Sequence, residues 1–263
     1  MRSLFISDVH LGTPFCEHEK LLTFLKSLEN KETGNYDLKY LYLVGDIVDL
    51  MDCNIPLLFT KHRSIIKKIF RMSDRGVKVI YIPGNHDHFF RHEHNSSFQN
   101  GFIITNKIIH KTQTGKSWLI IHGDEFDTAI QLIPFAYTLG DLGYKTLYRL
   151  SRWFGWIWKY FKNDDFSLAY YVKIKVKNII QFISSFEHLV NKVAEESGTD
   201  GIICGHIHQA ALKTIKGKDR DIQYGNCGCW TEPGQETFLI ENDQGEIELW
   251  KLTDWISRDH HLF

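Results

Sequence analysis

YLYLVGDIVD, residues 40–49, decides the fold class of this chain. The run begins with apolar, strand-forming residues and continues into a polar cluster that contains Gly45, Asp46 and Asp49. A short apolar run bounded by turn residues is typical of a buried strand. We therefore expect a strand over 40–44, with the polar side chains in the loop that leaves its carboxyl end.

The same order, an apolar run before a polar cluster, recurs along the chain. Further buried strands are expected at 3–7, 77–82, 117–121 and 201–204. Segments 21–30 and 57–76, which separate the first three strands, have the apolar spacing of helices, so the rhythm predicts a layered α/β domain. Shorter runs after residue 204 predict antiparallel additions to the sheet, at 211–215, 221–225, 237–241 and 246–252.

Residues 128–197 do not follow this rhythm. They hold a long aromatic and basic stretch, and then a helical run that ends before Gly198. We expect a mainly helical insertion over 128–197, packed over one end of the sheet, within a single domain that spans residues 1–263.

Composition and charge narrow the class of protein. The net charge of -1 and the pI near 6.9 do not favour a dedicated nucleic-acid binder. The five cysteines form no CxxC pair, which predicts a reducing compartment. The first residues lack the apolar centre of a signal peptide, and no apolar run is long enough to cross a bilayer. We therefore expect a cytoplasmic protein.

Five polar clusters follow the expected strands. In an open α/β sheet, the loops at the carboxyl ends of the strands meet in one crevice, so residues far apart in sequence come together. One such cluster alone would indicate turn chemistry, whereas five in this order indicate a site. The clusters are Asp8-Val9-His10, Gly45-Asp46-Ile47-Val48-Asp49, Gly84-Asn85-His86-Asp87, His122-Gly123-Asp124 and Gly205-His206-Ile207-His208.

The side chains in these clusters are carboxylates, imidazoles and one carboxamide, without a thiolate. Such a set favours Mn, Fe or Zn over a metal that prefers sulfur. It is large enough for two ions that share a carboxylate. Two ions roughly 3.5 to 4 Å apart can hold a bridging hydroxide and clamp a phosphoryl group during in-line displacement. Glycines such as Gly45 and Gly84 fit this arrangement, since turns there need positive φ or close backbone approach.

The motifs DVH, GDIVD, GNHD, HGD and GHIH resemble the signature of the calcineurin-like metallophosphoesterases. The resemblance covers most of the chain. It implies a four-layer α/β/β/α sandwich with a dinuclear metal centre and a helical insertion that serves as a lid. The chain is similar in particular to the UDP-2,3-diacylglucosamine diphosphatases of lipid A biosynthesis, through HGDEFD at 122–127, SLAYYVKIKVKNIIQFISSFE at 167–187 and DGIICGHIH at 200–208.

The resemblance also implies metal ligands. One ion is expected on Asp8, His10, Asp46 and His208. The other is expected on Asp46, Asn85, His122 and His206, so that Asp46 bridges the two. Manganese is the expected metal, with iron or zinc as alternatives.

Catalytic roles follow from the same resemblance. His86 is expected to donate a hydrogen bond or a proton to the substrate phosphate, with Asp87 as its orienting partner and Asn85 beside it in contact with substrate. Many members of the lipid A branch carry Arg at this position, so His86 departs toward the general family pattern, which bears on the substrate and not on the metal site. Asp49 and Asp124 are expected to orient histidine ligands.

Two other groups of residues permit more than one interpretation. His88, His92 and His94 lie in HDHFFRHEH, which suggests a third metal site or, as we prefer, an exposed loop. Cys227 and Cys229 in GNCGCW suggest redox or zinc chemistry, but without a CxxC pair we expect a turn that leads into a strand.

The insertion concentrates basic and aromatic residues. Residues 145–178 hold eight Lys or Arg against two acidic residues, and Trp153, Trp156 and Trp158 are three of the seven tryptophans. One interpretation is a helix pair that buries its aromatic side chains on the sheet. We favour a slot for acyl chains that is lined by these tryptophans and has a basic rim. The same segment would associate the protein peripherally with the inner face of the cytoplasmic membrane. A nucleic-acid groove is the weaker alternative.

Together these features predict a manganese-dependent diphosphatase whose substrate is a nucleotide-linked diacyl sugar. A metal-bridged hydroxide would hydrolyse UDP-2,3-diacylglucosamine to UMP and 2,3-diacylglucosamine 1-phosphate. An alternative keeps the same chemistry but acts on a soluble nucleotide or phosphodiester. A non-catalytic scaffold ranks last, because such proteins often lose metal ligands and none is missing here.

Overall fold

The computed structural model describes residues 1–263 except 94–95, 98–100, 128–182, 184, 218 and 259–263. The chain divides into two compact units, Met1–Asp124 with Val190–Phe263, and Glu125–Leu189. The expected helical insertion over 128–197 therefore lies largely outside the described residues, which include its helical end at 185–197. In the second unit, Phe126 and Phe186 are buried with their ring centroids 5.3 Å apart.

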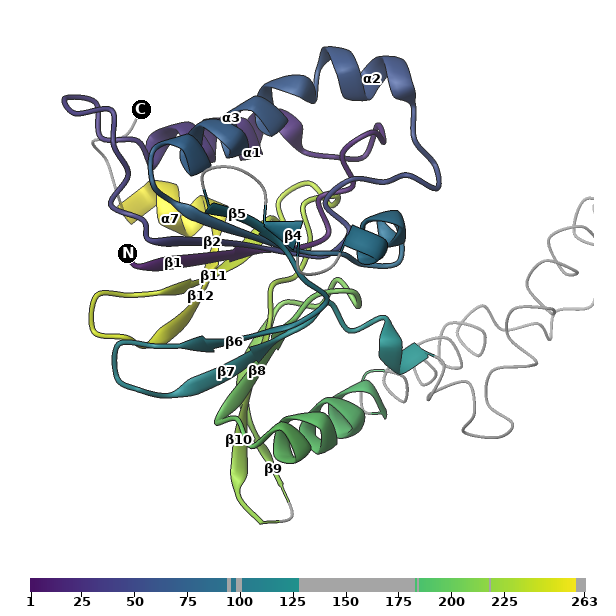
Figure 1. Cartoon of the computed structure of the whole chain (residues 1–263), viewed down its shortest axis with the longest axis vertical. Helices are drawn as coiled ribbons and strands as arrows, with labels where there is room; N and C mark the ends of the chain where they lie inside the picture. The colour runs from purple at the N-terminus through teal and green to yellow at the C-terminus, as the bar shows by residue number, and fades with distance from the viewer. Residues whose placement is uncertain (94–95, 98–100, 128–182, 184, 218, 259–263) are drawn as a thin grey trace, which may run out of the picture. The chain divides into compact units, whose positions relative to one another are not determined.

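A seven-stranded mixed sheet forms one layer of the first unit (Figure 1). The strands run in the order β12-β11-β1-β2-β3-β5-β4. β1, β2, β3 and β5 are parallel, while β11 is antiparallel to β1 as expected. The bounds are β1 Ser3–Ile6, β2 Tyr40–Val44, β3 Lys78–Ile82, β4 Ser96–Ser97, β5 Phe102–Ile104, β11 Thr237–Glu241 and β12 Ile247–Lys251.

The remaining strands form a second sheet of five, in the order β6-β7-β8-β10-β9. The strands expected at 117–121, 201–204, 211–215 and 221–225 belong to it, so they do not extend the first sheet. β10 is parallel to β8, which corrects the expected antiparallel pairing of this strand. The bounds are β6 Ile108–Lys111, β7 Ser117–Ile120, β8 Gly201–Cys204, β9 Ala211–Lys216 and β10 Asp221–Asn226.

Helices cover the outer face of each sheet (Figure 1). On the seven-stranded sheet they are α1 His18–Ser27, α3 Arg63–Asp74 and α7 Leu252–Arg258, with the short α2 Ile55–Thr60 before α3 and the 3-10 turn η1 His88–Glu93 after β3. The helical residues 190–197 cover the five-stranded sheet, with Val190 and Ala194 buried. The four-layer α/β/β/α arrangement is confirmed for this unit.

The central strands are buried on both faces, which explains their unbroken apolar sequences. In β2, Leu41 and Leu43 join the core beneath the helices, while Tyr42 and Val44 join the core between the two sheets. β1 and β3 alternate in the same way, because successive side chains of a strand point to opposite faces.

The expected helix over 57–76 is two helices. α2 begins at a cap in which Asn54 Oδ1 accepts from the backbone N–H of Leu57 at 3.0 Å, with Pro56 in the first turn. The break before α3 contains His62, which is buried and whose Nδ1 accepts from the backbone N–H of Gly12 at 2.8 Å. This bond ties the α2–α3 junction to the loop after β1.

Candidate metal centre

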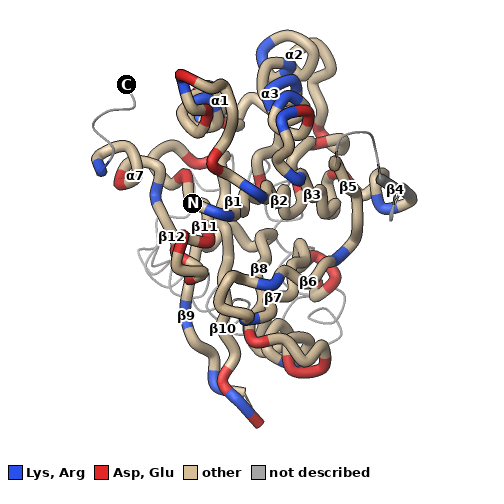
Figure 2. Tube along the Cα trace, turned by 60° about the vertical axis from the view of Figure 1, so that its left-hand side comes forward, with Lys and Arg blue, Asp and Glu red and all other residues tan. Residues whose placement is uncertain are grey.

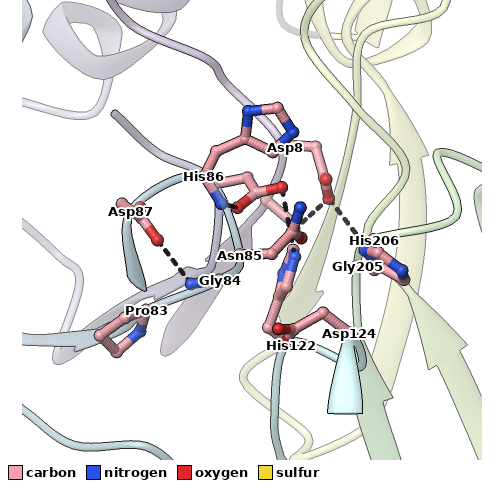
Figure 3. Close-up of polar contacts among 12 residues, drawn as sticks. Asp8, Pro83, Gly84, Asn85, His86, Asp87, His122, Asp124, Gly205 and His206 are labelled. Atoms are coloured by element: carbon pink, nitrogen blue, oxygen red, sulfur yellow. Dashed lines mark hydrogen bonds and ion pairs between the residues drawn. The ribbon is translucent and has the colours of Figure 1, made fainter. Parts of the chain in front are cut away.

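The polar clusters lie at the carboxyl ends of parallel strands from both sheets. The pairing of Ile6 with Leu43 and of Val44 with Ile82 makes β1, β2 and β3 end at the same level. In the second sheet β7 and β8 end together, and the backbone N–H of Gly205 donates to the carbonyl of His122 at 3.0 Å. Figure 3 shows Asp8, Asn85, His122 and His206 converging on one centre.

Asp8 and Asp46 each use one carboxylate oxygen to fix a loop and leave the other toward the centre. Asp8 Oδ2 accepts from the backbone N–H of His206 at 2.9 Å, and Asp8 Oδ1 lies 3.1 Å from His208 Nε2. Asp46 Oδ1 accepts from the backbone N–H of His86 at 2.8 Å. Asp46 Oδ2 lies 3.4 Å from His122 Nε2 and 4.0 Å from His10 Nε2.

Two histidines are fixed with Nε2 free to bind a ligand. His10 Nδ1 lies 2.9 Å from Asp49 Oδ2, and His122 Nδ1 lies 3.0 Å from the carbonyl of Val44. Because each Nδ1 faces an acceptor, it carries a ring proton and donates it, which leaves Nε2 as the nitrogen that can bind an ion. This is the arrangement that metal-binding histidines use, with one nitrogen oriented and the other presented to the ion.

Several polar atoms at the centre are buried without a hydrogen-bond partner among the residues that the structure describes. They include His10 Nε2, His122 Nε2 and Asn85 Oδ1. Leaving one such atom unsatisfied costs about 1–3 kcal/mol. Three good metal-ligand atoms left unpaired around one point indicate that the site is built for cations.

In the described part of the chain, four groups of ligand atoms lie within 4.8 Å of one another, and two of them consist entirely of expected ligands: Asp8, His10 and His208, and Asp46, His122 and His206. Asp46 Oδ2 faces both groups through its distances to His10 and His122. The oxygen and nitrogen donors suit Mn, Fe or Zn, and their number suits two ions. The structure thus brings together all the residues expected to bind metal.

The backbone at the centre adopts an unusual conformation. Five non-glycine residues in the described ranges have positive φ, and each is an expected ligand: Asp8, His10, Asp46, His206 and His208, with φ between 52° and 70°. This left-handed region is uncommon for residues with a side chain and costs on the order of 1–3 kcal/mol each. Such strain persists where the surrounding structure fixes it, which is characteristic of functional sites.

The glycines beside the ligands meet both needs anticipated from the sequence. Gly45 has φ +80°. At Gly84 the need is space, because a Cβ there would lie 2.3 Å from Asp46 Oδ1 and 2.6 Å from His122 Nε2. Any side chain at Gly84 would therefore displace two of the expected ligands.

The carboxylates at the centre raise the pKa values of two histidines beside them. Burial alone would lower the pKa of His122, but its contact with Asp46 and the charge of Asp8 raise it to about 9. Burial also opposes the charge of His208, yet its contacts with Asp8 and Cys229 raise the pKa to about 10. Without metal, therefore, protons occupy the positions that ions would take.

Asp49, rather than Asp87, lies beside His86. His86 Nδ1 is 2.9 Å from Asp49 Oδ2, the oxygen that also contacts His10. Asp87 is fully buried, and its oxygens accept from the backbone N–H groups of Gly84 at 2.5 Å and Ile47 at 2.9 Å and from the hydroxyl of Tyr81. In Figure 3 Asp87 points to Gly84 and away from His86. The expected pairing of His86 with Asp87 is therefore wrong, because Asp87 is engaged in holding two loops.

Asp124 does not orient a histidine ligand by direct contact either. Its two oxygens lie 2.6 and 2.7 Å from Arg91 Nη2. The expectation for Asp49 is confirmed through His10. Sequence reasoning also missed Ser7, whose hydroxyl donates to Asp8 and contacts the carbonyl of Val44 at 2.6 Å. Its position directly between the strand and the first ligand was the available signal.

The other candidate residues lie apart from the two groups or outside the described ranges. His88 and His92 are exposed, in agreement with the preferred loop interpretation, and His94 lies outside the described residues. Trp153, Trp156 and Trp158 also lie outside them. Cys227 is buried, and Cys229 forms a separate group of possible metal-binding residues with His208 and Glu232. All five cysteines are free.

A cavity of about 440 Å³ adjoins the centre. His10, Asp49 and His208 line it, together with residues such as Thr13, Phe15 and Thr231. It offers room for a substrate beside the first group of ligands. Among the described residues, no helix is long and apolar enough to cross a membrane.

Comparisons with known proteins agree with this geometry. The family model for calcineurin-like phosphoesterases matches residues 1–210. The chain is 26% identical over 267 aligned positions to the UDP-2,3-diacylglucosamine hydrolase of Blochmanniella pennsylvanica (strain BPEN), with 97% of this chain and 100% of that protein covered. The enzyme of the same name from Wigglesworthia glossinidia brevipalpis is 25% identical, with 89% of each chain covered. A predicted phosphoesterase of Streptococcus pneumoniae TIGR4 aligns at 13% identity over 95% of this chain and 89% of its own, with a TM-score of 0.39.

Proposed function

Because this chain belongs to the calcineurin-like phosphoesterases, a family of metal-dependent enzymes, we propose that it hydrolyses UDP-2,3-diacylglucosamine to UMP and 2,3-diacylglucosamine 1-phosphate. The observation that carries the proposal is the similarity to hydrolases of that name over nearly the whole length of both chains. A shared catalytic core alone would give a match limited to the metal motifs, whereas this similarity continues through the insertion.

Two divalent ions, with manganese as the proposed metal, would supply an activated water and stabilise the charge that develops on the phosphoryl oxygens. Asp8, His10, Asp46 and His208 would hold one ion. Asp46, Asn85, His122 and His206 would hold the other. These assignments are supported by the unpaired ligand atoms at the centre.

His86 is the proposed contact to the substrate phosphate. Asp49 Oδ2 lies 2.9 Å from Nδ1 of this ring, so Nε2 is the nitrogen left to donate to a phosphoryl oxygen or to a leaving group. Asn85 precedes it in the same loop, and its Oδ1 has no hydrogen-bond partner in the described part of the chain. Asp49 therefore acts as a positioning residue for His10 and His86 together, and Asp87 as a positioning residue for the loops.

We also assign acyl-chain binding and peripheral membrane association to the insertion, through Trp153, Trp156 and Trp158. Support comes from the composition of residues 145–178, which are aromatic and basic and fall short of spanning length. Replacing the three tryptophans by Asp should abolish turnover of the lipid substrate and spare a small chromogenic diester. Equal loss on both substrates would exclude an acyl slot.

One observation favours a second candidate, a soluble nucleotide or phosphodiester as substrate. The family resemblance implies Arg at the position of His86 in many of the lipid A enzymes, and an imidazole offers one donor where a guanidinium offers a fork of several. The change would weaken a bidentate grip on a diphosphate and leave general acid chemistry intact.

The deciding experiment is product analysis by mass spectrometry. Manganese-loaded protein is incubated with UDP-2,3-diacylglucosamine, and in parallel with UDP-glucose and bis(p-nitrophenyl) phosphate. We expect UMP and a diacylglucosamine phosphate at low enzyme concentration, with no products from the Asp46→Asn variant. Cleavage of the small substrates without the lipid would exclude the lipid reaction and support the second candidate. Absence of hydrolysis in every reaction would favour a scaffold.

A further inference from the structure

We propose that α2, the neighbouring face of α3 and Leu50 in the preceding loop form a docking face for an anionic lipid bilayer, separate from the metal centre and from the insertion. The α2–α3 face is defined by the exposed apolar residues Leu50, Ile55, Phe59 and Phe70 and by the cations Lys61, Arg63 and Lys67. The proposal does not depend on the identity of the substrate, since it concerns where the protein binds and not what it cleaves.

The first observation is that α2 is an apolar helix on the surface. Its sequence is IPLLFT, and none of its residues is buried. Ile55 is 62% exposed and Phe59 is 67% exposed. The Asn54 cap and Pro56 hold this segment as a helix, so its apolar side chains are presented by a defined element. Apolar side chains gathered on one surface mark an interaction site, whereas scattered ones need no explanation.

The second observation is an apolar cavity beneath the same side chains. Its volume is about 360 Å³, and every residue that lines it is apolar or aromatic. Leu50, Phe59 and Phe70 line it from the exposed side, and Leu58 and Phe90 line it more deeply. A surface that opens into an apolar space is suited to hydrocarbon and offers little to a polar partner.

The third observation is the charge around these side chains. Residues 53–73 contain five Lys or Arg and no acidic residue. Lys68 and Arg71 pair with Glu29 at 2.5 and 3.0 Å. Lys61, Arg63 and Lys67 are exposed and pair with no acidic side chain in the described part of the chain. The Lys and Arg positions recur along α3 in Figure 2. Apolar side chains flanked by cations are the composition of elements that rest in the headgroup region of anionic membranes.

The insertion carries the same sign of charge as this face. Residues 145–178 carry eight Lys or Arg against two acidic residues, so they share the sign of Lys61, Arg63 and Lys67. Anionic lipid headgroups are complementary to the charge of both segments.

The α2–α3 face is fixed relative to the metal centre. The backbone N–H of Leu50 donates to the carbonyl of His86 at 3.0 Å. His62, at the junction of α2 and α3, accepts from the backbone of Gly12, two residues after His10. Docking of this face would therefore hold the centre close to the bilayer surface, where a phosphorylated lipid presents its headgroup.

The test is co-sedimentation of the full-length protein with vesicles of equimolar phosphatidylcholine and phosphatidylglycerol, and with phosphatidylcholine alone. Each of Lys61→Gln and Lys67→Gln should lower the partition onto the anionic vesicles about fivefold, as expected for one cation near such a surface. Phe59→Asp should lower the partition about tenfold or more, because the variant loses an aromatic ring that would enter the bilayer. Ile109→Asp and Lys116→Gln on the second sheet are the matched controls, and both should bind as the wild type does.

Amide hydrogen exchange locates the contact. Anionic vesicles should slow exchange in residues 54–71 and leave the β9–β10 hairpin unchanged. Partition of the Phe59, Lys61 and Lys67 variants equal to that of the wild type would overturn the proposal and assign binding to the insertion. So would a dimer that forms without lipid and is lost in Phe59→Asp, because the face would then bind a second copy. Circular dichroism shows whether each variant is folded, and Ile55→Asp provides a second apolar position if Phe59→Asp is not.

Discussion

Replacing Asp49 by Asn is expected to disable a metal ligand that remains in place. Asp49 Oδ1 accepts from the backbone N–H groups of Met51 at 3.1 Å and Asp52 at 2.8 Å. Asp49 Oδ2 lies 2.9 Å from Nδ1 of both His10 and His86. In the variant, the carboxamide oxygen keeps the two backbone N–H groups, so the amide nitrogen faces the imidazoles.

A donor facing Nδ1 of His10 changes the tautomer of that ring. Nδ1 must then accept, and the ring proton moves to Nε2, the atom expected to bind metal. Loss of such an orienting partner lowers metal affinity or activity about tenfold to a hundredfold, or about 1.4 to 2.8 kcal/mol. The backbone bonds of the turn persist, so folding stability should change little.

The assay is calorimetric titration of the metal-free protein with Mn²⁺, combined with urea unfolding. Asp52→Asn is the matched control. It removes one negative charge from the same turn, but in the described structure the Asp52 side chain contacts no expected metal ligand. The metal affinity of this variant should stay within about twofold of the wild type. Unchanged affinity in Asp49→Asn would refute the argument from tautomers. An equal loss in both variants would refute it too, since charge alone would then account for the effect.

Four further predictions concern the centre and the fold. Binding of Mn²⁺ near neutral pH should release protons, because the carboxylates raise the pKa of His122 to about 9 and of His208 to about 10. The stability that these two protonated histidines give to the ion-free fold is present below about pH 6.5 and is lost as pH rises through those pKa values. Calorimetry in two buffers of different ionisation enthalpy measures the release, and a result of no release would contradict the prediction. Gly84→Ala should lower turnover of a small diester about a hundredfold by displacing Asp46 and His122, and near-normal turnover would show that the loop yields. Burial, with the charges of His18 and Lys61, lowers the pKa of His62 to about 4, so about 3 kcal/mol of stability is present above pH 6.5 and is lost as pH falls toward 4. The free energy of unfolding in urea of His62→Gln should lack this pH dependence. The same dependence of that free energy on pH in both proteins would exclude His62 as its source. Glu241→Gln should lower the free energy of unfolding in urea by about 3 kcal/mol and leave metal affinity unchanged, because buried Glu241 contacts Ser3 at 2.6 Å and His110 at 3.0 Å. A loss under about 1 kcal/mol would show that a neutral amide suffices at this position.

The central strands were predictable because both of their faces are buried. A strand such as β2, with Leu41 and Leu43 under the helices and Val44 between the sheets, must be apolar at every position. The division into two sheets left no such mark in any single strand, because an apolar run does not reveal which strand it pairs with. Only the family resemblance implied the second sheet.

The short elements were missed for a different reason. Residues 102–111 contain β5 and β6, which have three and four residues and belong to different sheets. Strands of this length carry too little periodicity to stand out from an apolar loop. The break between α2 and α3 depends on the bond between His62 and Gly12, which links residues 50 positions apart.

At the centre, the residue types were predictable and their second partners were not. Position after a strand brought Asp8, Asp46 and His122 to one point. Adjacency in sequence suggested that Asp87 contacts His86, but consecutive side chains in a tight loop point in different directions. Asp87 turns inward to the backbone of Gly84 and Ile47, and Asp49 from the neighbouring loop takes its place. The positive φ of the five expected ligands likewise arises from the folded loops.

The central claim is a two-ion centre built from loops of both sheets, and anomalous diffraction from crystals of the manganese-loaded protein tests it most directly. We expect two peaks roughly 3.5 to 4 Å apart, with Asp46 between them, Asp8, His10 and His208 around one, and Asn85, His122 and His206 around the other. A single peak, or a peak held by His208, Cys229 and Glu232 in place of this pair, would contradict the account.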